Sequence, residues 1–401
     1  MSLLPVEQAL EAIFARIPAP QPETVSLTEA NGRVLAAPLL AAHNQPPFAA
    51  SSMDGYAVRS ADFVQDRSES VHLVGISQAG AGFSGAVGPG EAVRIFTGAP
   101  VPEGADCVMM QELATVSEGR VSFSEQPTPG RSIRPVGNDF SAGQTLIPVG
   151  SRLTPYSLAL AAAANASTLS VSKRPTISVL ATGDELVLPG SPLAPDQIVS
   201  ANSYGLVPLL TPFAKLVSDH GIARDNVEDL KNKLEGTLNA DIVVTTGGAS
   251  VGDHDIVQDV LKELGVKIGF WRINMRPGKP LMFGTRGRTL IFGLPGNPVS
   301  ALVTATVFIK PALRHWLGLA PELPLWRLPL AAPTPANTAR RHFMRARLVH
   351  ADKGSALLPI LETDSGHTSS LASADFLIVQ PEHDRGQPEG ALVEALRIDE
   401  F

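Results

Sequence analysis

The chain contains very little cysteine and no long apolar run. Cys107 is the single cysteine among 401 residues, so the chain forms no intramolecular disulfide and builds no cysteine-ligated metal site. We interpret it as a small buried apolar residue. The most apolar stretch, residues 158–164, is much shorter than the roughly 20 residues that a membrane-spanning helix requires, so we expect no membrane association.

An excess of positive charge is also absent. Lys and Arg number 32 against 39 Asp and Glu, which gives a formal net charge of −7. A phosphate backbone needs a basic surface, so this balance disfavours nucleic acid as a partner, although a local basic pocket can still bind a small anion. The first residues lack a basic segment followed by an apolar core, so we expect no signal peptide and a cytoplasmic location.

Hydrophobic residues, glycine and proline are abundant. Hydrophobic residues make up 44% of the chain, which is ample for several cores. The length predicts about two to four domains. Apolar residues recur at helical spacing over residues 5–17, whereas residues 25–149 consist of short apolar runs separated by Gly, Pro and Ser. The first pattern predicts a helix and the second a β-rich region.

Strand-like and helix-like patterns alternate over residues 173–318. Strands are predicted at 176–180, 241–245 and 289–292, and helices at 206–220, 227–238, 256–264 and 299–317. This alternation predicts an α/β layer with a mostly parallel sheet. A proline-rich linker at 321–335 precedes β-like patterning over 340–398, which predicts a small C-terminal β domain.

Each of the three predicted strands ends in a polar, glycine-rich loop. The loops are residues 181–185 (ATGDE), 245–255 (TTGGASVGDHD) and 293–298 (GLPGNP). Ligands of open α/β sheets bind at the carboxyl ends of the strands, so we expect the three loops to converge on one cleft.

The composition of these loops predicts the ligand. Consecutive glycines let backbone N–H groups approach an anion, and Thr246, Ser250 and the helix start after Gly252 add further donors. Four acidic residues of the same loops would repel a phosphate unless a divalent cation bridges them, namely Asp184, Glu185, Asp253 and Asp255. The loops therefore predict a phosphate ester bound with Mg²⁺.

A basic turn, residues 276–280 (RPGKP), adds two cations that suit a transferring phosphoryl group or an oxyanion. Simpler interpretations exist for each motif alone: a Gly-Gly loop is usually a turn, Asp184 can cap a helix, and PGNP can simply lead into one. Neither a Walker A sequence nor a Gly-x-Gly-x-x-Gly fingerprint occurs at these positions, which disfavours an ordinary NTPase or dehydrogenase.

Several of these motifs together resemble the MoeA family, which includes the E domain of gephyrin. The resemblance is carried by residues 245–255, 276–280 and 294–300 (LPGNPVS), by 51–58 (SSMDGYAV), by 94–102 (RIFTGAPVP), and more loosely by 366–371 (GHTSSL). It extends over essentially the whole chain. A MoeA protein is implied to be a molybdopterin molybdenumtransferase, which inserts molybdate into adenylated molybdopterin with Mg²⁺ and releases AMP.

The resemblance also implies an elongated homodimer of L-shaped subunits with a composite active site. Subdomain I would comprise residues 1–42 and 134–172, and subdomain II residues 43–133. A MogA-like α/β domain would span 173–320 and a β-barrel-like domain 321–401. The site would lie between the α/β domain of one subunit and the Met-Asp-Gly-Tyr region of the other. A MogA-type adenylyltransferase and other cofactor-biosynthesis proteins are the implied protein partners.

Site roles follow where the motifs match. The resemblance implies catalytic roles for Asp54, Thr97, Glu185, Asp253 and Lys279. Glu185 and Asp253 would also hold the metal. Substrate contacts would come from Thr182, Gly183, Asp184, Gly247, Gly248, Ser250, Gly252, Arg276, Pro295, Gly296, Asn297, Pro298 and Ser370.

One position departs from the family pattern, and two other functions remain open. Many relatives have Lys where Arg276 stands; the positive charge is kept, but a planar fork replaces a compact ammonium. The first alternative is a molybdopterin adenylyltransferase, although these are expected to be single-domain. The second is a non-catalytic pterin-binding scaffold, although Asp54, Glu185, Asp253 and Lys279 are all present. Molybdate and tungstate are not distinguished by the sequence.

Overall fold

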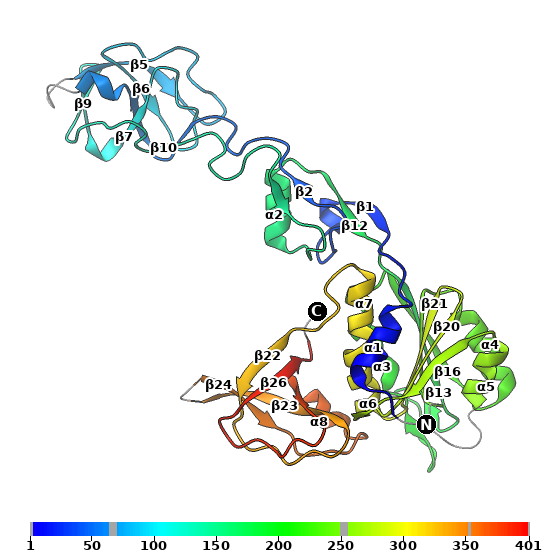
Figure 1. Ribbon diagram of the computed structural model, residues 1–401. Coiled ribbons are helices and arrows are strands. Elements are labelled where there is room, and N and C mark those ends of the chain that lie inside the picture. Colours follow the sequence, from blue (N-terminus) through cyan, green and yellow to red (C-terminus); the bar gives the residue numbers. More distant parts are fainter. Residues whose placement is uncertain (1–2, 64–69, 249–255, 352–353, 400–401) are drawn as a thin grey trace. The chain divides into compact units, whose positions relative to one another are not determined.

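The computed structural model describes residues 3–63, 70–248, 256–351 and 354–399 and is shown in Figure 1. The chain divides into two compact units. Unit 1 comprises Met1–Glu23, Gly32–Ala36 and Ser170–Phe401, and unit 2 comprises Thr24–Asn31 and Ala37–Leu169. The finer division into four subdomains stays a prediction.

Unit 2 is built around a six-stranded sheet of order β7-β4-β6-β5-β9-β8. The bounds are β4 Gly55–Val58, β5 Val71–Ser77, β6 Glu91–Ile95, β7 Cys107–Met110, β8 Ala114–Ser117 and β9 Arg120–Phe123. Side chains of β4, β6, β7 and β9 form an apolar core in which Cys107 is fully buried. The β-rich character predicted for this region and the buried cysteine are both confirmed.

Short ribbons and one helix form the rest of this part of the chain. The paired strands are β1 Pro22–Ser26 with β12 Thr168–Ser172, β2 Leu39–Leu40 with β11 Thr145–Ile147, and β3 Ala50–Ser51 with β10 Ile133–Arg134. Helix α2 (Pro155–Ala163) begins at a capping residue: the Thr154 hydroxyl accepts the N–H of Ser157 at 3.2 Å. Pro155 takes the first helical position, where an N–H is not needed.

Unit 1 contains the α/β sheet, whose strand order is β16-β13-β17-β21-β20-β18. The bounds are β13 Thr176–Thr182, β16 Leu216–Ala223, β17 Ile242–Thr246, β18 Lys267–Arg272, β20 Pro280–Arg286 and β21 Thr289–Leu294. Strands β16, β13, β17 and β21 pair in parallel, whereas β20 runs antiparallel to its two neighbours. The three predicted strands are therefore adjacent at the parallel centre of a mixed sheet.

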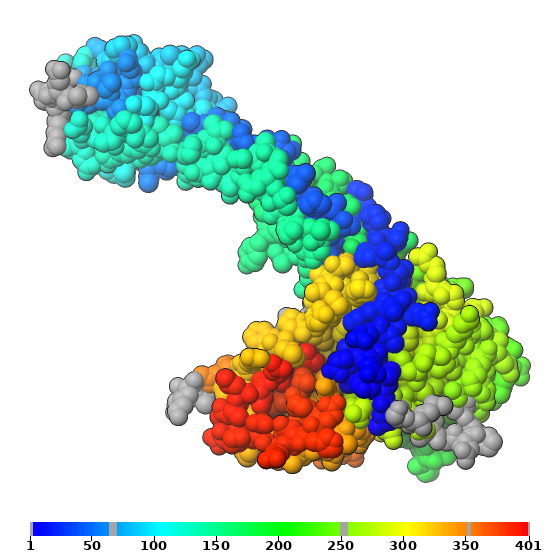
Figure 2. Space-filling view, in the orientation of Figure 1, coloured from blue at the N-terminus to red at the C-terminus, as the bar shows by residue number. Residues whose placement is uncertain are grey.

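Helices cover both faces of this sheet (Figure 1). One face packs against α1 Val6–Phe14, α3 Asn202–Leu210, α6 Pro298–Thr304 and α7 Lys310–Trp316, and the other against α4 Val227–Thr237 and α5 Ile256–Glu263. In β17, Ile242 and Val244 enter the first core and Val243 the second. Because both faces are buried, the central strands are mostly apolar along their whole length, as in other parallel sheets. Figure 2 shows α1 (blue) packed between the C-terminal strands (red) and the α/β region.

The C-terminal strands form a second sheet of unit 1, of order β19-β23-β25-β26-β22, with β24 on β23. The bounds are β19 Met275–Arg276, β22 Leu325–Pro329, β23 Arg341–Ala351, β24 Gly354–Pro359, β25 Phe376–Gln380 and β26 Leu392–Arg397. A bridge between Leu330 and Leu357 joins the two ends of the sheet, so the predicted barrel-like domain is confirmed. Strand β19 comes from the α/β region and ties that region to the barrel.

Two of the predicted helices differ from the structure. The helix predicted over 206–220 ends at Leu210, and residues 216–223 form the edge strand β16. Gly221, with φ +76°, lies within that strand, and its backbone conformation is not helical. The helix predicted over 299–317 is continuous but changes to a π-helical segment, Ala305–Ile309, between α6 and α7. Strands β18 and β20 were not predicted. No helix in the described ranges has the length and apolarity needed to cross a membrane.

Candidate active site

The three glycine-rich loops meet at the carboxyl edge of the α/β sheet. The N–H of Gly247 donates to the carbonyl oxygen of Leu294 at 3.3 Å. Gly247 has φ +89°, and a Cβ built there would lie only 2.2 Å from the carbonyl oxygen of Thr182. A Cβ at Gly296 would lie 3.6 Å from the Cα of Gly247. The sequence prediction that these loops converge is therefore correct, and their contact requires glycine at 247.

The two acidic residues of the first loop have different surroundings. Asp184 Oδ1 accepts the N–H of Asp225 at 3.1 Å, so this carboxylate is engaged within the loops. The Glu185 carboxylate lies over Gly183, since a Cβ at Gly183 would be 2.5 Å from Glu185 Oε2. No hydrogen bond from a described residue reaches the Glu185 carboxylate. Glu185 is therefore the better placed of the two to bind a ligand.

The second loop continues beyond the described residues. Ser250, Gly252 and Asp253, which the sequence assigned to substrate or metal, lie outside the described ranges. Among the residues that are described, no three Asp, Glu, His or Cys side chains gather closely enough to hold a metal ion. Glu185 alone still suits Mg²⁺, because this ion commonly binds through one or two carboxylates together with substrate phosphates.

Asn202, at the start of α3, was missed by the sequence analysis. Its Nδ2 donates to the carbonyl oxygen of Gly296 at 2.7 Å and fixes the third loop. Its Oδ1 is buried and has no hydrogen-bond partner among the described residues. A buried acceptor left unpaired is costly, which is typical of a position that pairs with a ligand or a water molecule.

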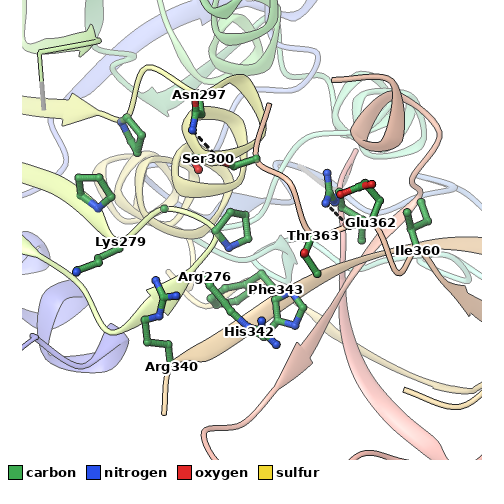
Figure 3. Close-up of a pocket in the computed structure, with 16 residues that line it drawn as sticks. Arg276, Lys279, Asn297, Ser300, Arg340, His342, Phe343, Ile360, Glu362 and Thr363 are labelled. Carbon is green, nitrogen blue, oxygen red and sulfur yellow. Dashed lines mark hydrogen bonds between the residues drawn. The ribbon is translucent and has the colours of Figure 1, made fainter. Parts of the chain in front are cut away.

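A cavity of about 390 Å³ lies beside these loops, between the α/β sheet and the barrel of unit 1 (Figure 3). Arg276, Lys279 and Arg340 lie together on one side of it, away from Glu362. The lining comprises Arg276, Pro277, Gly278, Lys279, Pro280, Pro295, Asn297, Ser300, Arg340, His342, Phe343, Arg345, Ile360, Glu362, Thr363 and Ser365. Pro295 and Asn297 link it to the third glycine-rich loop, and Asn297 Nδ2 donates to Ser365 Oγ at 2.8 Å.

Arg276 enters the cavity from the basic turn. Gly278 has φ +101°, and a Cβ there would lie 2.2 Å from Thr304 Oγ1, so the turn packs tightly on α6. The Nε of Arg276 is buried without a partner, and none of the described carboxylates forms an ion pair with it. Burial, and next the positive charge of Arg340, lower the pKa of Arg276. An arginine without a counter-ion beside a second cation is suited to an anionic ligand.

Arg345 is held in the cavity wall by the loop that follows β24. Its guanidinium donates to the carbonyl oxygens of Glu362 and Asp364 and to Ser370 Oγ. Ser370 Oγ in turn donates to the carbonyl oxygen of His367 at 2.7 Å, at the start of helix α8 (Thr368–Ala372). Ser370 does not line the cavity, so in this structure it positions Arg345. Burial lowers the pKa of Arg345, which nonetheless stays charged at neutral pH.

The barrel contributes more to the cavity than the sequence analysis expected. Arg340, His342, Arg345 and Glu362 were not among the predicted site residues. Residues 343–349 (FMRARLV) were predicted to form a strand, because apolar residues there alternate with basic ones. Nothing in that pattern predicted which basic residues face inward.

In unit 2, Asp54 and Thr97 lie together, as the family motifs imply. Both the N–H and Oγ1 of Thr97 donate to Asp54 Oδ1 at 2.8 Å. These hydrogen bonds, with a smaller contribution from Arg94, hold the pKa of Asp54 below its usual value. Arg94 lies over the Tyr56 ring at 4.9 Å and donates to the Gly55 carbonyl oxygen at 3.2 Å. Asp54 is therefore an ionised, exposed carboxylate on a braced loop.

Family comparisons agree with this architecture over three consecutive regions. Residues 4–165 match the MoeA N-terminal region (domain I and II), and residues 178–315 match a probable molybdopterin binding domain. Residues 327–398 match the MoeA C-terminal region (domain IV). The α/β region with its three loops is thus the part that matches the molybdopterin binding domain.

Whole-chain comparisons give the same result. The molybdopterin molybdenumtransferase of Haemophilus influenzae is 40% identical over 79% of this chain and 78% of its own. The molybdopterin molybdenumtransferase of a Nostoc species is 40% identical over 74% of this chain and 70% of its own. The solved structure of the molybdopterin biosynthesis MoeA protein from Pyrococcus horikoshii covers 100% of both chains at 31% identity, with a TM-score of 0.85. The resemblance and the fold class predicted from the sequence are confirmed, and the chain belongs to the MoeA family.

Proposed function

We propose that this chain is a molybdopterin molybdenumtransferase that inserts molybdate into adenylated molybdopterin and releases AMP. The observation that carries the proposal is the cationic cavity directly beside the glycine-rich loops. The relatives from Haemophilus and Nostoc bear the name of this activity. We expect the reaction to take place in the cytoplasm.

Molybdate is the substrate that fits the cavity. It is a small tetrahedral dianion whose oxygens accept hydrogen bonds, and the cavity offers Arg276, Lys279 and Arg345 as donors. The Ser300 hydroxyl and the Asn297 amide line the same space and add neutral donors. In a partly enclosed site these interactions are stronger than in water, so the cavity can concentrate the anion.

The phosphates of the pterin substrate fit the glycine-rich loops. Gly247 and Gly248 lie at the carboxyl edge of the sheet against Thr182, and the backbone N–H of Gly248 is the one that would approach a phosphate, because that of Gly247 bonds Leu294. Glu185 and Asp253 would hold Mg²⁺, which when bound neutralises charge on the phosphates. The adenylated pterin would thereby bring its dithiolene next to the anion in the neighbouring cavity.

A homodimer with a composite site is part of the proposal. The Asp54 carboxylate, which accepts two hydrogen bonds from Thr97, lies in unit 2 on a loop that matches the MoeA N-terminal region. We expect it to complete the site of a second subunit, where its ionised carboxylate would orient the nucleophile that attacks the phosphoanhydride. A MogA-type adenylyltransferase would supply the adenylated substrate. The regions matched outside 178–315 favour this transferase over an adenylyltransferase function.

AMP release tests this proposal. With adenylated molybdopterin and Mg²⁺, we expect micromolar molybdate to stimulate AMP release by the wild-type chain, and Asp54→Asn to reduce the stimulated rate about a hundredfold or more. Asn keeps the size of the side chain and an acceptor for Thr97 but removes the charge. Asp62→Asn, which changes another acidic residue of unit 2, is the matched control and should leave the rate unchanged. Substrate binding without any AMP release would instead favour a carrier or scaffold.

A further inference from the structure

His342 is a buried histidine near three arginines of the cavity lining. It lines the cavity from β23, and its side chain is only 6% exposed. Arg276 of β19 is its register partner on one side, and Gln380 of β25 on the other. The roles proposed above for the anion and the pterin use the cations and the loops and leave this imidazole without a function.

The hydrogen bonds of Gln380 define which ring nitrogen carries the proton. Gln380 Nε2 donates to the carbonyl oxygen of Pro335 at 2.7 Å and to Asp384 Oδ1 at 3.2 Å. The amide oxygen of Gln380 is therefore turned to His342 Nδ1, 3.3 Å away, and must accept a hydrogen from it. In the neutral ring the other nitrogen, Nε2, is then an acceptor.

The charged groups around His342 keep the ring neutral. Burial is the first cause, and Arg276, Arg345 and Arg340 add to it; together they lower the pKa of His342 to about 4 despite the hydrogen bond with Gln380. Lys279 adds positive charge across the same cavity. Glu362, the one carboxylate among the described lining residues, is engaged with the N–H of Asp364 at 2.7 Å and with His367 at 3.3 Å.

An oxyanion in the cavity favours the protonated form of the His342 ring. Its oxygens only accept hydrogen bonds, so beside a neutral His342 the lone pair of Nε2 would face another lone pair. Protonation of Nε2 turns an acceptor into a charge-assisted donor, and the negative charge of the ligand offsets the repulsion from the three arginines. Nδ1 keeps its bond to Gln380 in both states, so no rearrangement of the ring is required.

We propose that His342 takes up one proton when a tetrahedral oxyanion enters the cavity, so that molybdate binding and proton uptake are coupled. This inference rests on the proposed function, because it requires the cavity to be the oxyanion site. The proton comes from solvent and stays on Nε2, and no bond of the anion is broken. The empty site, with its neutral ring, then carries one positive charge fewer than the occupied one.

The sign of the pH dependence follows from this coupling. The ring is neutral in the empty site above a pH of about 4, and its pKa rises when the anion binds. Binding is therefore linked to uptake of one proton wherever the pH lies between these two pKa values. In that window the affinity falls about tenfold for each unit of rising pH, and above the pKa of the occupied site it becomes independent of pH.

Calorimetry of molybdate binding to the full chain measures the proton directly. Titrations at about pH 6 in two buffers with different ionisation enthalpies give the number of protons taken up per bound anion. We expect close to one for the wild type. Sodium sulfate, which remains a dianion at this pH, is titrated in parallel so that protonation of molybdate itself does not enter the result.

Two variants test whether His342, and not another histidine, takes up the proton. His342→Gln keeps a hydrogen-bonding side chain but cannot take up a proton, so proton uptake should fall to near zero and the affinity should lose its pH dependence. His350→Gln is the matched control, because His350 lies on the same strand but is exposed and outside the cavity. Uptake in this control should equal that of the wild type.

The titration of the His342 ring in the wild type gives a second measurement that needs no folded variant. Its NMR signal should titrate at clearly higher pH with molybdate than without. Molybdate binding without proton uptake by the wild type would overturn the coupling and leave the proposed function intact. Failure of the wild type to bind molybdate at all would overturn both.

Discussion

Replacing Arg345 with methionine is expected to reduce kcat/KM for molybdate-dependent AMP release by about a hundredfold to a thousandfold. The size follows from removing a largely buried cation that faces a dianion, since one such donor commonly contributes about 3–4 kcal/mol in a preorganised site. Arg345 also ties its wall together through Glu362, Asp364 and Ser370, so the loop that carries Thr363 and Ser365 loses its anchor as well.

Two further variants, Arg345→Lys and Arg347→Met, test whether the loss comes from the cavity or from the overall charge of the barrel. Lysine restores the charge but cannot reach several acceptors at once, so we expect it to recover only part of the activity. Arg347 lies two residues further along β23 and is exposed, so Arg347→Met removes the same charge from the same strand without touching the cavity. Equal losses in Arg345→Met and Arg347→Met would mean that the overall charge of the barrel, and not the cavity, controls activity.

Gly247→Ala is expected to abolish most of the activity and to lower the melting temperature of the chain. A residue with a Cβ in the left-handed region costs about 1–2 kcal/mol, and overpacking adds about 1–3 kcal/mol. At this position φ is +89° and the added Cβ would lie 2.2 Å from the carbonyl oxygen of Thr182. That oxygen belongs to the backbone at the end of a central strand, so the two loops must move apart. The edge of the sheet that we propose to bind phosphate would change shape with them.

Gly287→Ala is the matched control for the backbone conformation. Gly287, in the turn between β20 and β21, also has a left-handed backbone, with φ +58°, but a Cβ there would have no neighbour within 4 Å. Its replacement should therefore cost only the conformational part and leave AMP release unchanged. A Gly247→Ala enzyme as active as Gly287→Ala would show that the contact between the first two loops does not support catalysis.

The α/β core could be predicted because each of its central strands is specified by its own sequence pattern. Strands β13, β17 and β21 are mostly apolar and rich in β-branched residues, since both faces of each are buried, and each is followed closely by glycines and polar residues. Such patterns specify a buried strand and its loop without knowledge of the neighbours. The edge strand β16 was not predictable in the same way. Its half-exposed residues have a mixed pattern, and only pairing with β13 makes them a strand.

The site residues likewise fall into two groups, those that local sequence identifies and those that only long-range packing identifies. Glycine at 247 and the cations of residues 276–280 can be identified from the sequence, because a tight loop and a basic turn need particular residue types wherever they occur. Asn202, Arg340, His342 and Arg345 could not be identified, because each is an ordinary residue of a helix start, a loop or a strand until long-range packing brings it to the loops or the cavity.

The sequence by itself determined the class of the α/β core, the three loops, the basic turn and the family to which the chain belongs. The tertiary structure decided that β19 pairs with β23 and that the barrel therefore supplies half of the lining of the cationic cavity. It also decided that His342 has Arg276 and Gln380 as neighbours. The physical reason is that charge and burial act through space. The pKa of a histidine depends on the groups within a few ångströms of it, and these come from segments that are far apart along the chain.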